Sequence, residues 1–169
     1  IGGSTFRGCN SLEAIQLPEN VTELSPGLFA NCTQLRKIRI PEKVQEIGSG
    51  TFLNCTSLTE INIPKSMGRE TIVGSYSDGP FEGCKNLKTI NFEEGITEIP
   101  NCLFQDCEGI EEIKIPDTVT SINSGAFSGA KNLKTVTIPN SVVTIGGSTF
   151  RGCNSLEAIQ LPENVTELS

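Results

Sequence analysis

The chain has 169 residues and carries a formal net charge of −7 at pH 7. This acidic balance argues against a nucleic-acid partner, which would require a basic face, and no apolar run approaches the ~20 residues that span a bilayer. Histidine is absent, so the chain lacks the commonest general base and the commonest zinc ligand.

One pattern recurs along the chain, and it begins with Phe followed three residues later by Cys. Cysteine recurs in steps of 23 residues, lengthened once to 29, with Ala130 in one of its places: Cys9, Cys32, Cys55, Cys84, Cys107 and Cys153. Phenylalanine keeps the same step: Phe6, Phe29, Phe52, Phe81, Phe104, Phe127 and Phe150. Such a period indicates a repeat architecture in which units too short to fold alone stack and share one core.

Each unit then reads Leu-x-x-Ile-x-Ile-Pro-x-x-Val-x-x-Ile. The stretch "LRKIRIP" (35–41) alternates Ile38 and Ile40 with polar residues, which predicts a strand that ends at the proline. Val44 and Ile47 send a second pair of aliphatics inward, and Gly/Ser pairs turn the chain back to the Phe position. Equivalent strands of successive units should lie parallel in a right-handed coil.

The middle of the chain carries an insertion of six residues between Pro64 and Phe81, within residues 65–80. It contains Tyr76, the only tyrosine of the chain. A length change in one repeat usually protrudes on one edge, where loops often carry function. The alternative is a variation in loop length without a function.

These residues resemble the BspA-type (Treponema-type) leucine-rich repeat, and the resemblance covers the whole chain. The chain departs from the repeat pattern at Ala130, which stands in a cysteine position, at Glu93, which stands in a proline position, and in the insertion. The resemblance implies an α/β-class repeat solenoid, mostly β, with a right-handed leucine-rich-repeat coil, one parallel sheet on its concave side and little helix. We expect a single solenoid over residues 1–169, with about seven 23-residue units of which the first and last are incomplete.

The first 25 residues (1–25) and the last 25 (145–169) are identical. Neighbouring units such as 9–31 and 32–54 agree at only 10 of 23 positions. Units that accumulate substitutions at this rate would not leave two identical segments of 25 residues. We therefore interpret the identity as a recent block duplication or an engineered copy. We expect the chain to be a window from a longer array, and its ends to associate end to end because they expose strand edges and unfinished core.

The cysteines invite a metal or redox interpretation, but their 23-residue step contains no close pair. A stacked solenoid would place them in one buried column, where free Cys acts as a small hydrophobe and Ala130 can replace it. We therefore expect reduced thiols, no metal and no cofactor. Cys102 lies outside the column, in a place that other units fill with Gly or Ser, and we expect it to be the most accessible thiol.

Polar residues flank the inward Ile of each predicted strand and should face outward. The densest basic cluster is Arg36, Lys37 and Arg39, beside Glu60 and Asn62 of the next unit. Together with Tyr76 these residues form our candidate protein-binding site, in which a partner gains charge complementarity and an aromatic anchor. The alternative is that Arg36 only pairs with Glu13. Charges along the stack, such as Lys88, Glu111 and Lys134, should pair across strands.

These observations predict an extended, non-enzymatic scaffold. The resemblance implies a protein-binding solenoid in a cell-surface or secreted adhesion protein, with a host or extracellular-matrix protein as partner. From charge and hydropathy we expect no nucleic-acid partner and no membrane insertion. The alternative from another class is a structural spacer or an engineered repeat scaffold without a ligand of its own.

Overall fold

A computed structural model describes residues 2–68, 72–73 and 78–168, and within these residues it contains strands and turns but no helix. The strands form two columns. The front column holds β1 (Ala14–Ile15), β3 (Lys37–Ile38), β5 (Glu60–Ile63), β7 (Thr89–Phe92), β9 (Glu112–Lys114), β11 (Thr135–Thr137) and β13 (Ala158–Ile159). The rear column holds β2 (Glu23–Leu24), β4 (Glu46–Gly48), β6 (Ile72–Val73), β8 (Glu98–Ile99), β10 (Ser121–Ile122), β12 (Thr144–Ile145) and β14 (Glu167–Leu168).

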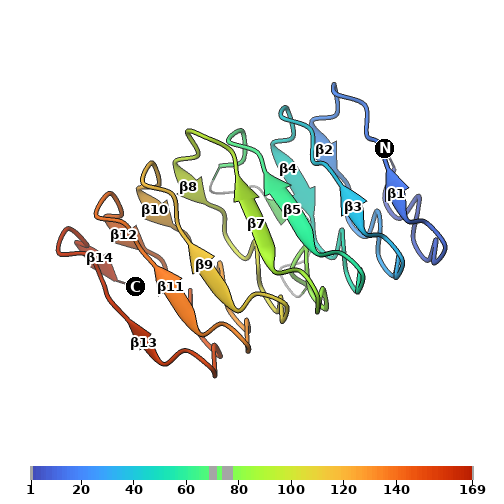
Figure 1. Cartoon of the computed structure of the whole chain (residues 1–169). Coiled ribbons are helices and arrows are strands. Elements are labelled where there is room, and N and C mark those ends of the chain that lie inside the picture. Colours follow the sequence, from blue (N-terminus) through green and yellow to red (C-terminus); the bar gives the residue numbers. More distant parts are fainter. Residues whose placement is uncertain (1, 69–71, 74–77, 169) are drawn as a thin grey trace.

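The strands pair only with their equivalents in neighbouring coils, and every pairing is parallel. Ala14 lies opposite Lys37 in the front column, and Glu23 lies opposite Glu46 in the rear column, each at the 23-residue step. The coils therefore stack into a solenoid with the first and last coils at opposite ends (Figure 1). The predicted class of fold is confirmed.

The prediction of one parallel sheet is wrong in one respect, because the Val-x-x-Ile segments form a second column of strands behind the first (Figure 1). Gln45 N–H, for example, donates to Thr22 C=O at 2.9 Å, and Val143 N–H donates to Thr120 C=O at 2.9 Å. Coils stacked at strand spacing bring every extended segment within hydrogen-bonding distance of its equivalent, so both sides of the coil form ladders.

The core consists of like residues stacked on like. The phenyl rings of the Phe column lie 5.1 to 5.8 Å apart between centroids, and the five inner rings are fully buried. The thiols of Cys32, Cys55, Cys84 and Cys153 each donate to the Phe carbonyl of the preceding coil, as Cys55 does to Phe29 at 3.2 Å. The packing role predicted for both columns is confirmed, and Ala130 is equally buried.

One constraint of the coil was not predicted. The residue before each cysteine-column position has a left-handed backbone, with φ between 54° and 74°: Gly8, Asn31, Asn54, Gly83, Asp106, Gly129 and Gly152. Only Gly, Asn and Asp occupy these places, because they are the residues that tolerate this conformation best. The side-chain oxygen of Asn54 lies directly over Gly83 of the next coil, where a Cβ atom would collide with it.

We expect Gly83→Ala to destabilise the protein more than Gly8→Ala. Both positions have left-handed φ, +71° and +73°, so each alanine introduces about 1–2 kcal/mol of backbone strain. Only at Gly83 does the new Cβ also meet Asn54, whereas nothing lies within 4 Å at Gly8. Urea titrations give the two free energies of unfolding, and Asn54→Gly should remove the additional cost of Gly83→Ala. Equal costs for the two alanines would contradict the contact.

Candidate protein-binding surface

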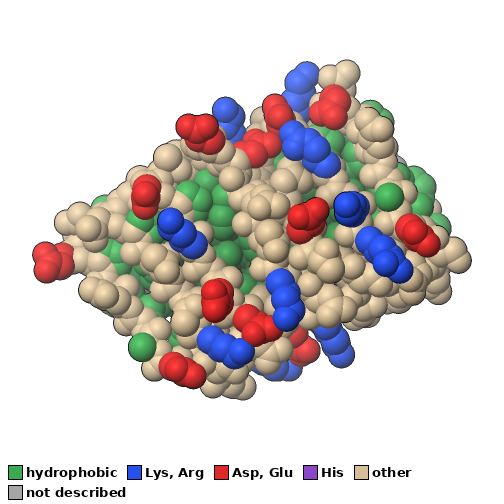
Figure 2. All heavy atoms as spheres, viewed as in Figure 1, with side chains coloured by type: hydrophobic (Ala, Val, Ile, Leu, Met, Phe, Trp, Pro, Cys, Tyr) green, Lys and Arg blue, Asp and Glu red, His purple; other side chains and the backbone are tan. Residues whose placement is uncertain are grey.

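A hollow of about 520 Å³ lies on the front face over β1 and β3. It exists because the front position that Lys37 and Glu60 fill in later coils is occupied in the first coil by the short Ala14. Its lining is apolar at the floor and charged at the rim: Ala14, Ile15, Gln16, Leu17, Glu19, Lys37, Ile38, Arg39 and Glu60. Apolar side chains are exposed between charged ones on this face (Figure 2).

The structure brings three of the predicted site residues together, since Lys37, Arg39 and Glu60 all line this hollow. Arg36 is exposed next to Lys37 but does not line the hollow. The outward orientation of Lys37 and Arg39 follows from strand alternation around the buried Ile38. Tyr76 lies outside the described residues.

Asn62 has a structural role that the sequence did not indicate. Its side-chain amide donates to Ile40 C=O at 2.8 Å, and its side-chain oxygen accepts from Ile40 N–H at 2.8 Å. The side chain thereby replaces ladder hydrogen bonds between β3 and β5, which belong to separate sheets. Asn62 holds β5 beside the hollow, and both polar groups of its side chain are already occupied.

The basic residues of the cluster differ in their partners. The guanidinium of Arg39 donates to Glu42 at 2.7 Å, which raises the pKa of Arg39, and it lies 3.9 Å from Glu93. Arg36 and Lys37 form no ion pair within the described part of the chain. Arg36 contacts Glu13 through its backbone N–H, at 2.9 Å from the Glu13 carbonyl, rather than through its charge. The alternative in which Arg36 pairs with the Glu13 carboxylate is therefore not observed in the described residues.

The middle of the front face is neutralised by the predicted cross-strand pairing. Glu111 accepts from Lys134 at 2.8 Å and from Lys88 at 2.7 Å, the two lysines lying one coil away on either side. These two cations lower the pKa of Glu111 to about 2. The charges of Lys88, Glu111 and Lys134 are thus compensated within the protein, in contrast to that of the exposed Lys37.

We expect the stabilising effect of the Glu111 pairs to depend on pH. Because the folded-state pKa is lowered from 4.5 to about 2, the contribution is complete above pH 4.5 and is lost as the pH falls through 2. Glu111→Gln should lower Tm at pH 7 and have almost no effect at pH 2. The difference should be small, because exposed ion pairs are weak and screened by salt.

The matched control is Glu112→Gln, at an exposed neighbour that forms no ion pair within the described residues. It should leave the pH dependence of Tm unchanged. A Glu111→Gln effect of equal size at both pH values would contradict the assignment.

The seven cysteines are all free thiols. Burial raises the pKa of Cys55 and Cys107 to about 12 and that of Cys84 well above its usual value. The prediction that Cys102 is the most accessible thiol is wrong: Cys102 is half-buried, whereas Cys9 of the first coil is exposed. No group of three or more His, Cys, Asp or Glu side chains that could hold a metal ion occurs in the described residues.

Native thiol labelling should therefore reach Cys9 first, Cys102 second, and the inner column only after denaturation. Cys153 provides an internal control, because it has the same flanking sequence as Cys9 but is covered by a preceding coil and is only 9% exposed. Peptide mapping after brief alkylation at pH 8 gives the order. Modification of Cys153 as fast as Cys9 would contradict the stacking at that end.

Parallel strands stacked coil on coil around columns of like residues define a leucine-rich-repeat solenoid. The sequence matches the BspA type leucine rich repeat region over residues 1–77 and 70–169, in six copies, and the chain belongs to this family. Leucine-rich repeats generally bind proteins and are generally not enzymes. No curated protein matches the chain.

Solved structures of bacterial leucine-rich repeat proteins have the same fold. The Treponema pallidum protein TpLRR is 30% identical with a TM-score of 0.71, over 92% of this chain and 70% of that one. A Eubacterium ventriosum protein is 26% identical with a TM-score of 0.70, over 92% and 41%. A Bacteroides ovatus protein is 25% identical with a TM-score of 0.65, over 98% and 47%. The chain thus spans less than half the length of the last two.

No helix long and apolar enough to cross a bilayer occurs in the described part of the chain.

Proposed function

We propose that the chain is a non-enzymatic protein-binding solenoid whose front face receives the partner at the hollow over β1 and β3. The hollow carries the proposal, because it combines an apolar floor with an exposed, unpaired ammonium group on its rim. Such a combination buries apolar surface and selects by charge. On an acidic protein, Lys37 offers an acidic partner segment an electrostatic contact beside apolar surface.

Within this site the residues have different roles. Lys37 and Arg36 provide charge to the partner, and Glu60 restricts where a partner carboxylate can lie. Arg39 shares its charge with Glu42, and Asn62 positions β5. Tyr76 remains in the proposal as an aromatic anchor on sequence grounds alone.

We place the protein at the cell surface or in the secreted fraction, as part of an adhesion protein that binds a host or extracellular-matrix protein. The support is the BspA-type repeat and the protein-binding role that leucine-rich repeats generally have. The organisation as one solenoid of about seven units over residues 1–169 belongs to the same proposal. The seven front strands of the described residues, each followed by one rear strand, support it.

A second candidate function is a spacer or an engineered scaffold without a ligand of its own. The two identical 25-residue segments favour it, because an exact copy is what a block duplication for length, or a designer, would produce.

The test is binding of the purified chain to a panel of immobilised extracellular-matrix proteins. Lys37→Glu should weaken any true interaction about tenfold, because it replaces an attraction by a repulsion at the rim. Ala14→Phe should weaken it similarly by filling the hollow without a change of charge. Lys85→Glu, the same change of charge at an exposed site away from the hollow, is the control and should have no effect.

Thermal melts of all three variants should coincide with that of the parent chain, since none of these side chains is buried. A partner whose affinity is unchanged by both Lys37→Glu and Ala14→Phe would place the site elsewhere. A panel without any binding partner would favour the spacer.

A further inference from the structure

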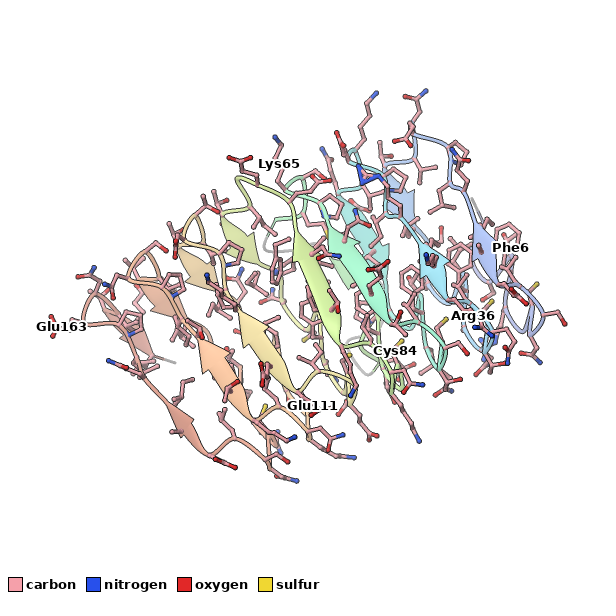
Figure 3. The ribbon with its side chains drawn as sticks, in the orientation of Figure 1. Phe6, Arg36, Lys65, Cys84, Glu111 and Glu163 are labelled. Atoms are coloured by element: carbon pink, nitrogen blue, oxygen red, sulfur yellow. The ribbon has the colours of Figure 1, made fainter. Side chains whose placement is uncertain are left out.

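The identical segments place one coil sequence in two environments. The first coil (residues 2–24) is covered on one side by the second coil (residues 26–48), whereas the last coil (residues 146–168) exposes the same side. Leu24 is 0% exposed, but its equivalent Leu168 is 64% exposed. Leu17 is 4% exposed, and its equivalent Leu161 is 40% exposed. The two coils lie at opposite ends of the stack, marked by Phe6 and Glu163 (Figure 3).

The contacts that cover the first coil are specific. Phe6 stacks on Phe29 at 5.4 Å, and the thiol of Cys32 donates to Phe6 C=O at 3.1 Å. The N–H groups of Ser4, Phe6 and Gly8 donate to carbonyls of the second coil at 3.1, 3.0 and 2.8 Å. The strands of the two coils also pair in both columns, β1 with β3 and β2 with β4.

The last coil carries every group needed for the same contacts. Ser148, Phe150 and Gly152 repeat the three donors, and their N–H groups have no backbone acceptor within the described residues. The backbone also repeats: φ is 57° at Ser4 and 58° at Ser148, and 73° at both Gly8 and Gly152. The surface of the second coil that fits the first coil therefore fits the last coil residue for residue.

We propose that two copies of the chain of residues 1–169 associate by exchange, with the last coil of one copy replacing the first coil of the other against its second coil. The new interface joins the same residue types in the same register as the interface that it replaces. The free-energy difference between the two arrangements therefore comes from which coil is conformationally ordered. The first coil packs on the second coil alone in the described structure, and releasing it returns the conformational entropy of its residues. The last coil is already ordered by its neighbour, through Phe127–Phe150 stacking at 5.8 Å and two strand pairings.

Opposing this gain is the loss of translational and rotational freedom on association, so the exchange depends on protein concentration. The chain path needs to change only at Ser25, between the first coil and the second. Each copy contributes one last coil and one second coil, so the contact is head to tail and nothing obliges the assembly to close.

The test uses one substitution placed at two equivalent positions. Leu24→Asp weakens the hold of the first coil on its own second coil and leaves the last coil intact, so association should begin at an about tenfold lower concentration. Leu168→Asp disables the exchanging coil, so association should be lost. Sedimentation velocity over a concentration series measures both effects. The milder substitutions Leu24→Ala and Leu168→Ala should also strengthen and weaken association, respectively.

Hydrogen exchange separates this arrangement from simple stacking of two intact ends. As the concentration of the parent chain rises, amides of residues 2–24 should become less protected while those of residues 146–168 become more protected. Increased protection at both ends, weaker association in the residue-24 variants, or a strictly monomeric parent chain at all concentrations would each overturn the exchange.

Discussion

Coil-on-coil stacking in a constant register is the constraint on which this molecule depends. Because each unit is too short to enclose a core, a buried side chain meets mainly its own equivalents in the coils before and after it. Phe rings lie on Phe rings, four of the column thiols donate to carbonyls of the preceding coil, and strands pair at the 23-residue step. The coil with the insertion keeps this order, with Ile61 opposite Ile90 and Phe81 stacked on Phe52.

Most of the fold could be predicted because this register is written in the sequence as a period. Phe52, Cys107 and Ala130 are buried where the period places them. The second column of strands was missed because its short Val-x-x-Ile segments lack the alternation that marks a strand, and they are extended only because the coil closes around them. The sequence shows that only Gly, Asn or Asp stands immediately before each position of the cysteine column. These residues are common in turns of several types, so their presence alone does not reveal the backbone angle φ.

The candidate surface was predictable only in part. Strand alternation placed Lys37, Arg39 and Glu60 correctly on one face, since that face follows from the buried Ile38. The hollow could not be foreseen, because it arises from the length difference between Ala14 and the side chains beside it. The roles of Asn62 and Arg39 depend on Ile40 and Glu42, which periodicity does not connect with them.

The contact of Asn54 with Gly83 has a consequence for how such a protein can evolve. Where the left-handed residue of one coil carries a side chain, the equivalent residue of the next coil must avoid a clash with it. That residue is glycine, as Gly129 is after Asp106, or its side chain forms a hydrogen bond with the first, as Asn54 does with Asn31. Neighbouring coils are thus inherited as compatible pairs, and recombination that shuffles single units would often join mismatched ones. The duplicated coil carries glycine at this place, Gly8 and Gly152, and so it can follow any other unit.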